Sequence, residues 1–216
     1  MSVTVAKTAG FCFGVRRAVD LAEQQAKQGG EIYAYGEIIH NMHEIARLEK
    51  MGVHTAQTLD GIPDGERVLI RAHGVARSVY DAFRQKNCEI YDATCPFVQK
   101  IHRIVDRESR DGRLVLILGK EGHPEVEGIR GWCSESVVID GEQAAQTFAD
   151  ALEPASRPVS LVAQTTVNRA IWNISVSILK KRCTNLKIFD THQIHQVPYQ
   201  PGLLSLRSRQ HGFVKR

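Results

Sequence analysis

Two cysteines and three histidines stand where an apolar strand gives way to a helix, a setting that suits metal binding or acid–base chemistry. Cys12 and Cys95 each precede a predicted helix, whose free N–H groups and partial positive charge favour the thiolate. The histidines at such turns are His40, His73 and His123. In a parallel α/β fold the carboxyl ends of the strands face one crevice. We therefore expect these side chains and Glu125 to converge on one metal-centred site.

The segment His123-Pro124-Glu125 combines an imidazole with a carboxyl group two residues later. An imidazole can hydrogen-bond an anion or a hydroxyl, and a carboxyl group can deliver a proton where burial tunes its pKa. His40 and His73 suit contacts to an anion such as phosphate. A single histidine of this kind is more often a surface or helix-capping residue, whereas three at equivalent turns favour a site. The other histidines on predicted helices or connectors are expected outside it: His43, His54 and His102.

The spacing of the cysteines bears on the kind of metal. A structural zinc site usually draws on cysteines spaced as C-x-x-C, and no such pair is present. An iron–sulfur cluster accepts widely spaced cysteines. Gly10 and Gly14 flank Cys12 and let the backbone approach a bulky cofactor, while the glycine pattern of a dinucleotide fold is missing. The remaining cysteines lack the helix-start setting and are expected to be buried thiols: Cys88, Cys133 and Cys183.

The composition of the 216-residue chain is that of a globular protein, with 43% hydrophobic and 24% charged residues. Its apolar runs are too short to span a bilayer and its N-terminus lacks a secretory signal, so we expect a cytoplasmic protein with no membrane partner. Residues 191–216 contain four basic residues and no carboxylate, which leaves 28 − 4 = 24 basic and 24 acidic groups in residues 1–190. Four cations without interleaved aromatic residues do not predict a nucleic-acid partner.

Strands and helices alternate along the chain, which predicts a parallel α/β architecture. Strands are expected over residues 3–8, 32–36, 67–72, 89–93, 114–118, 137–139, 160–163 and 186–189, with helices between most of them. The loop carrying His40 should lead to a helix that ends near Gly52, and the first helix should leave Arg17 on its outer face. We expect two similar lobes, residues 1–95 and 96–190, followed by an irregular basic tail over residues 191–216.

Six segments resemble, in order, the 4-hydroxy-3-methylbut-2-enyl diphosphate reductase family over about residues 3–190. They are Gly10–Ala18, His40-Asn41, Ala72–Val75, Asp92–Pro96, Gly122–Gly128 and Gln164–Thr166. The resemblance implies an oxidoreductase of the non-mevalonate isoprenoid pathway that forms isopentenyl and dimethylallyl diphosphate. It also implies three α/β lobes around a central [4Fe–4S] cluster held by three cysteines. A ferredoxin or flavodoxin as electron donor and a monomeric or dimeric state are implied as well.

The resemblance assigns roles residue by residue. Cys12 and Cys95 match cluster ligands, and Glu125 matches the proton source. The residues that match contacts to the diphosphate, or groups that organise its protons, are His40, His73 and His123. Thr165 would lie near the substrate.

The sequence departs from the family pattern near residue 190. The family has a third ligand cysteine just after the strand that corresponds to residues 186–191, followed by a third lobe, whereas no cysteine follows Cys183 here. Cys183 is expected inside the preceding helix and is a poor substitute, and His192 or His195 is a weaker one. We therefore predict low or no activity.

Two other classes of function stay open. One is a non-catalytic folded remnant, or a diphosphate-binding protein that depends on a partner for its activity. The other is a zinc hydrolase that uses His123 and Glu125, which would need more histidine ligands at short spacing than the sequence provides.

Overall fold

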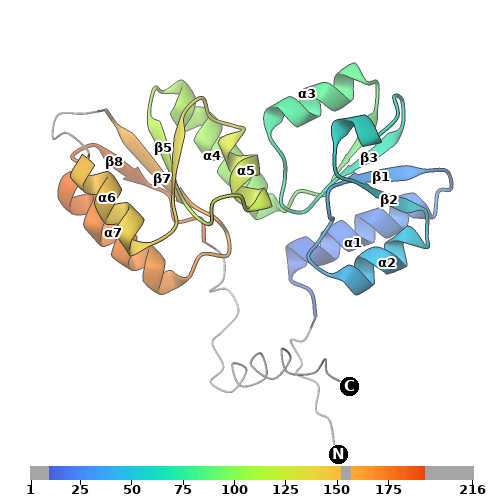
Figure 1. The fold of residues 1–216 in the computed structure, drawn as a ribbon, viewed down its shortest axis with the longest axis horizontal. Coiled ribbons are helices and arrows are strands. Elements are labelled where there is room, and N and C mark those ends of the chain that lie inside the picture. The colour runs from blue at the N-terminus through green and yellow to red at the C-terminus, as the bar shows by residue number, and fades with distance from the viewer. Residues whose placement is uncertain (1–9, 152–156, 193–216) are drawn as a thin grey trace, which may run out of the picture.

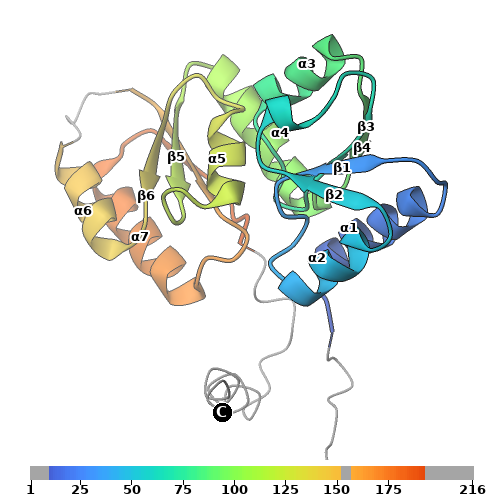
Figure 2. The same cartoon turned by 45° about the vertical axis from the view of Figure 1, so that its right-hand side comes forward.

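The computed structural model describes residues 10–151 and 157–192. These residues form two parallel four-stranded sheets that lie side by side, each with helices on both faces (Figures 1 and 2). The α/β class with two similar parallel-sheet lobes is therefore confirmed. The strand predicted over residues 3–8 and residues 193–216 of the predicted tail lie outside the described part. No described helix has the length and apolar character needed to cross a membrane.

The first sheet has the strand order β2-β1-β3-β4. Its elements are α1 (Phe13–Ala26), β1 (Ile32–Tyr35), α2 (Met42–Glu49), β2 (Val53–Ala56), the 3-10 turn η1 (Leu59–Gly61), β3 (Arg67–Ile70), α3 (Arg77–Gln85) and β4 (Glu89–Asp92). Helices α1 and α2 cover one face and α3 covers the other (Figure 1). Each face of the sheet thus buries its own apolar cluster, as parallel sheets require.

The second sheet has the equivalent order β6-β5-β7-β8. Its elements are α4 (Pro96–Arg110), β5 (Leu114–Leu118), α5 (Pro124–Arg130), β6 (Ser136–Ile139), α6 (Glu142–Ala151), β7 (Val159–Ala163), α7 (Arg169–Arg182) and β8 (Leu186–Ile188). Every residue of β5 and β7 is buried, as expected for central parallel strands. Helices α6 and α7 cover one face, while α4 and α5 lie between the two sheets (Figure 2).

The structure corrects three local predictions. Strand β2 was not predicted, because its short sequence Val53–Ala56 contains a histidine and a threonine and becomes a strand only through pairing with β1. Arg17 is half-buried and bonded to the protein, not on an outer face. Helix α7 ends at Arg182, so Cys183 follows the helix, and its side chain packs in the core of the second lobe.

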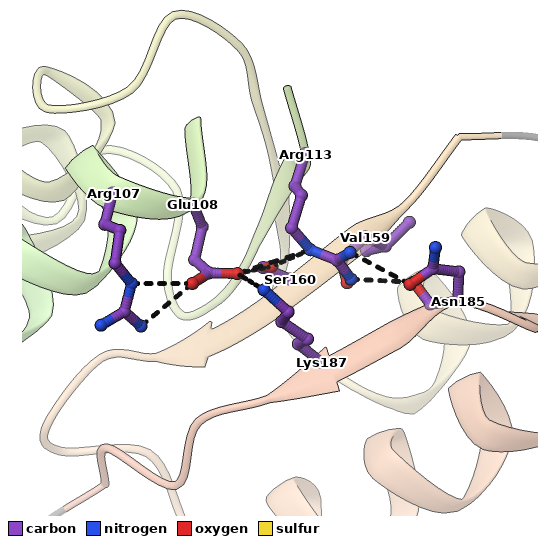
Figure 3. Close-up of polar contacts among 7 residues, drawn as sticks. All are labelled: Arg107, Glu108, Arg113, Val159, Ser160, Asn185 and Lys187. Atoms are coloured by element: carbon purple, nitrogen blue, oxygen red, sulfur yellow. Dashed lines mark hydrogen bonds and ion pairs between the residues drawn. The ribbon is translucent and has the colours of Figure 1, made fainter. Parts of the chain in front are cut away.

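A buried polar network holds the amino end of the second sheet (Figure 3). Glu108, 1% exposed, accepts a hydrogen bond from Ser160 Oγ at 2.9 Å and pairs with Lys187 Nζ at 3.0 Å. Arg113, 8% exposed, donates to Ser160 Oγ at 2.7 Å and to the side-chain and backbone oxygens of Asn185 at 3.0 and 2.9 Å. The network therefore ties α4 and the short edge strand β8 to β7, at the sheet edge opposite the strands' carboxyl ends.

Candidate active site

The two sheets place the predicted site residues at their topological switch points. Strands β1 and β3 are neighbours although β2 lies between them in sequence, and β5 and β7 flank the corresponding point of the second sheet. His40 follows β1 and His73 follows β3, whereas His123 follows β5 and Thr165 follows β7. Ligands of open parallel sheets bind in the crevice outside the carboxyl ends of the strands at such points. The fold therefore gives each lobe one half of a common site.

The three predicted histidines form one cluster across the lobes. The ring centroids of His40 and His73 are 4.5 Å apart, and those of His123 lie 5.9 and 5.7 Å from them. Nitrogen atoms of all three rings lie within 4.8 Å of one another. Residues separated by more than eighty positions in sequence are thus brought together, as the strand-end positions led us to expect.

Electrostatics keep two of these imidazoles neutral. Burial, aided by the neighbouring His40, lowers the pKa of His73 to about 3. Burial is also the main cause that lowers the pKa of His123, and the proximity of His40 adds to it. At neutral pH the cluster therefore presents uncharged His73 and His123 rings, which an arriving anion would shift towards protonation.

The hydrogen bonds of the cluster define which nitrogen of each ring faces it. His123 caps α5, and its Nδ1 accepts the backbone N–H of Glu125 at 3.1 Å. A neutral ring that accepts at Nδ1 carries its proton at Nε2, so His123 can donate from Nε2. His40 Nδ1 lies 3.5 Å from the Glu37 carboxylate, and His73 Nδ1 is buried without a hydrogen-bond partner among the described residues.

Glu125 is the buried acid of the site. It is the second residue of α5, after Pro124 at the first helical position, and is 3% exposed. Thr165 donates its backbone N–H to Oε1 at 2.7 Å and its hydroxyl to Oε2 at 2.8 Å. Burial raises the pKa of Glu125 to about 7, although these two hydrogen bonds act in the opposite direction. The carboxyl group therefore exchanges a proton near neutral pH, as a general acid must.

The two predicted ligand cysteines lie at adjoining helix starts. Cys12 is the N-cap residue of α1 and Cys95 is the N-cap residue of α4. Arg17 of α1 donates hydrogen bonds to the carbonyl oxygens of Thr94 at 3.0 Å and Asp92 at 3.1 Å, which fastens α1 to the end of β4. A Cβ atom on Gly14 would lie only 2.6 Å from Cys95 Sγ. Glycine at 14 therefore allows the thiol of Cys95 to approach the first turn of α1.

The expected lowering of the thiol pKa is wrong for Cys95. Burial raises the pKa of Cys95 above its usual range, and the backbone N–H groups of Phe97 and Val98 offset this only in part. Electrostatic interactions with Cys12 and Glu125 raise this pKa further. Desolvation outweighs the helix N-terminus here, because the thiol lies deeper than its position in the sequence suggested.

A close contact between the lobes sets the relation of His73 to His123. Trp132, just after α5, donates its indole N–H to the carbonyl oxygen of Val75 at 2.8 Å. A Cβ on Gly128 would lie 3.4 Å from the backbone of Gly74, and one on Gly131 would lie 2.1 Å from the Cβ of Ala76. We call this contact between residues 74–76 and 128–132 the glycine seam. It joins the loop after His73 to the helix that His123 begins.

The remaining predicted histidines and cysteines lie outside the cluster. His43 is exposed, His54 pairs with Glu31, and His102 is buried and stacks on Trp132 at 5.0 Å. Cys183 precedes the amino end of β8, at the edge opposite the site. Cys88 and Cys133 are half-buried. His192 is buried, 2.5 Å from Asp190 and 2.6 Å from Arg169.

Sequence reasoning missed three residues beside the site: Arg17, Glu37 and Arg71. Arg71 directly follows the end of β3 and lies two residues before His73. A cation at the carboxyl end of a central strand was the signal that could have identified it. Arg17 gave no such signal, because its partners are backbone carbonyl groups 75 and 77 residues away.

Comparison with known proteins decides the family. Residues 3–194 match the model of the LytB protein family. The chain belongs to this family. The LytB chain is 38% identical over 192 residues to the 4-hydroxy-3-methylbut-2-enyl diphosphate reductase of Clostridioides difficile, covering 88% of this chain and 68% of the relative. It is 42% identical over 194 residues to the enzyme of that name from Geobacter sulfurreducens, covering 88% and 66%.

Solved structures agree with this assignment. The E-1-hydroxy-2-methyl-but-2-enyl-4-diphosphate reductase from Plasmodium falciparum superposes with a TM-score of 0.80 at 27% identity, over 87% of this chain and 59% of that one. An (E)-4-hydroxy-3-methyl-but-2-enyl diphosphate reductase, described as the terminal enzyme of the non-mevalonate pathway, gives 0.75 at 34% identity, over 88% and 67%. The LytB chain spans about two thirds of the length of the curated relatives that it matches.

Proposed function

We propose that this LytB chain carries the site that converts 4-hydroxy-3-methylbut-2-enyl diphosphate to isopentenyl and dimethylallyl diphosphate in the cytoplasm. The reaction is a two-electron reduction in which the substrate hydroxyl leaves as water. The observation that carries the proposal is Glu125. It is a buried carboxyl group with a pKa near 7, beside both a thiol pair and a histidine cluster.

Glu125 and Thr165 together suit delivery of the proton that the departing hydroxyl needs. Glu125 is almost fully buried, whereas Thr165 is half-buried and bonded to it through Oγ1. When the carboxyl group is protonated, the bond can reverse, so that Glu125 donates to Thr165 and the threonine hydroxyl donates outward. A group with a pKa near 7 holds a proton in about half of the molecules at neutral pH and can regain it after each transfer.

Cys12 and Cys95 fit two positions of a three-cysteine cluster site. Both start helices, and the absence of a side chain at Gly14 leaves room beside the Cys95 thiol. A [4Fe–4S] group held there would supply the electrons, drawn from a ferredoxin or flavodoxin. No further cysteine of the described residues lies at the carboxyl ends of the strands, which supports the prediction of low activity for the chain by itself.

The histidine cluster suits the diphosphate. His123 presents an N–H donor from Nε2, and His40 and His73 are close enough to share the same ligand. An anion would also favour the protonated forms of His73 and His123, so that binding and proton uptake would occur together.

The zinc hydrolase alternative requires three imidazole lone pairs directed at one ion. The grouping of nitrogen atoms within 4.8 Å favours such a site. The hydrogen bond from the Glu125 N–H to His123 Nδ1 argues against it, because that tautomer directs a proton, not a lone pair, from Nε2. The cluster therefore suits an anion better than a cation.

Anaerobic reconstitution tests the proposal. The full chain is loaded with iron and sulfide, both are quantified, and oxidation of a reduced viologen dye is followed on adding the hydroxymethylbutenyl diphosphate. Substrate-dependent oxidation that is lost in Glu125→Gln and retained in the surface variant Glu142→Gln supports the proposed reaction. Iron incorporation without any substrate-dependent oxidation supports the alternative of a non-catalytic or partner-dependent protein. Zinc without sulfide in the purified chain would revive the hydrolase.

A further inference from the structure

Arg71 is a half-buried cation beside the histidine cluster that forms no ion pair with the described residues. It lies between the end of β3 and His73, and its side chain is half-buried. Its Nε is buried and has no hydrogen-bond partner in the described part of the chain, and its guanidinium makes no ion pair there. Burying a charged group without a partner costs free energy, so such groups are normally paired. An anionic ligand would supply the missing partner.

The backbone of the first lobe is shaped to hold this side chain. Gly36 directly follows β1 and has a φ of +72°, a conformation that favours glycine. A Cβ atom at this position would lie 2.5 Å from Arg71 Nη1 and 3.4 Å from its Cζ. The guanidinium of Arg71 therefore packs directly on the chain at residue 36, between the ends of the two strands that meet at the switch point.

The charge of Arg71 reaches the histidine cluster. It contributes to lowering the pKa of both His73 and His123, and burial lowers the pKa of Arg71 itself. The carboxylate of Glu37, 3.5 Å from His40 Nδ1, attracts the Arg71 cation and raises its pKa, but it forms no ion pair with Arg71 in the described part of the chain. Arg71 therefore adds positive potential beside the neutral rings of His73 and His123.

We propose that Arg71 is a phosphate-binding residue, whose guanidinium donates hydrogen bonds to an oxygen of a diphosphate held by His40, His73 and His123. The proposal rests on the proposed function, because it adds a charged donor to the same diphosphate site. Arginine suits this role, because its planar fork matches two phosphate oxygens.

Calorimetric titration of the full chain with inorganic pyrophosphate tests the role of Arg71. Arg71→Gln should weaken binding about 10- to 100-fold, the range expected for loss of a charged hydrogen-bond donor. Arg71→Lys should weaken it less, because the charge is kept and the fork is lost. Arg84→Gln on α3, an exposed arginine paired with Asp81, removes the same charge far from the cluster and should leave the affinity unchanged.

A direct readout separates binding from a structural role. Pyrophosphate should move the ¹⁵N resonance of the Arg71 Nε–H, and a residue that only supports the backbone would show no such shift. Circular dichroism shows whether each variant folds. If Arg71→Gln does not fold, the pyrophosphate affinity of Arg71→Lys tests the proposal.

The outcomes distinguish the two proposals. If the parent chain binds pyrophosphate, His73→Ala abolishes binding and both Arg71 variants bind normally, the role of Arg71 is wrong and the diphosphate site stands. An equal loss in Arg84→Gln would also overturn the role of Arg71, since long-range charge would then explain the effect. If the parent chain itself does not bind pyrophosphate, the diphosphate site fails and this inference fails with it.

Discussion

The two lobes share one strand order and divide the chemistry between them. The first lobe supplies the two thiols, two imidazoles and the guanidinium of Arg71, whereas the second supplies one imidazole, the acid Glu125 and its partner Thr165. In the proposed reaction the first lobe would hold the electron-transfer group, the second would deliver the proton, and both would contact the anion. The comparison shows that the fold fixes where a functional group stands and the residue at the strand end fixes what it does.

The amino ends of the sheets are anchored in different ways. In the first lobe Arg67, at the start of β3, donates to backbone carbonyl groups of Gln25, Glu31 and the Gly29-Gly30 turn, close to solvent. In the second lobe the buried Arg113 belongs to a network that includes the buried carboxylate of Glu108 (Figure 3). Only the second anchor removes an ion-pair partner from a buried carboxylate when its arginine is replaced.

Removal of the arginine from each anchor should give the largest difference in stability loss between the two lobes. Arg113→Met should lower the free energy of unfolding by about 2–3 kcal/mol, because buried hydrogen bonds to Ser160 and Asn185 are lost and Glu108 loses one of its ion-pair partners. Arg67→Met removes only contacts to neutral carbonyl groups and should cost about 1 kcal/mol. Urea denaturation measures both. Similar losses would show that the two anchors are energetically equivalent, whereas recovery in Glu108→Leu with Arg113→Met would confirm that the weakened pairing of the Glu108 charge causes the loss.

The buried acid gives the second lobe a pH dependence with a defined sign. The folded-state pKa of Glu125, about 7, lies above the ordinary value of 4.5, so the folded protein holds an extra proton between these values. Its contribution to stability is present below pH 4.5 and is lost as the pH rises through 7. Glu125→Gln should therefore raise the free energy of unfolding by about 2–3 kcal/mol at pH 8 and change it little at pH 4.5. An equal increase in the free energy of unfolding at pH 8 and at pH 4.5 would show that burial does not raise the pKa of Glu125.

Anion binding should be accompanied by the uptake of protons from solution. Burial holds His73 and His123 neutral, so an anion that raises their pKa values draws protons from solution. Pyrophosphate affinity should increase as the pH falls from 7 to 6, by about tenfold if one proton is taken up. Titrations in buffers of different ionisation enthalpy count the protons directly. Binding that is independent of pH would mean that the neutral rings suffice.

Loss of a helix cap should cause the smallest loss of stability, and the loss should be the same in both lobes. Asn41 caps α2 by accepting the N–H of Glu44 at 3.1 Å, and Asn168 caps α7 by accepting the N–H of Ala170 at 2.7 Å. Replacing either residue by alanine should cost about 1 kcal/mol of stability. Thermal unfolding of the two variants gives the comparison. A much larger loss for Asn41→Ala would indicate that the loop carrying His40 depends on this cap.

Much of the fold followed from sequence patterns, because parallel strands with adjacent helices produce strong local signals. The strand Leu114–Leu118 was predicted with its observed bounds, since five apolar residues lie between charged and glycine-containing turns. Strand β2 was missed, because pairing with β1 and not its own composition makes it a strand. Helix α7 stops before Cys183, a boundary that no cap residue in the sequence announced.

The site was predictable in its members and less so in its energetics. Strand-end positions were enough to expect the meeting of His40, His73 and His123, because parallel topology brings such positions together. The depth of the Cys95 thiol was not predictable, since it depends on α1 packing against it from a distant part of the chain. The position of Arg71 at a strand end was visible in the sequence, whereas its lack of an ion pair with the described residues depends on the three-dimensional surroundings.

The glycine seam limits which substitutions the protein can tolerate. Ala76 and Gly131 face each other so closely that a single added methyl group would lie 2.1 Å from its neighbour. Both positions already hold nearly the smallest side chains available, so neither can grow unless the backbone moves. Any substitution at one of these positions is therefore limited by the residue at the other. A bulkier pair would hold the two lobes, and with them His73 and His123, farther apart.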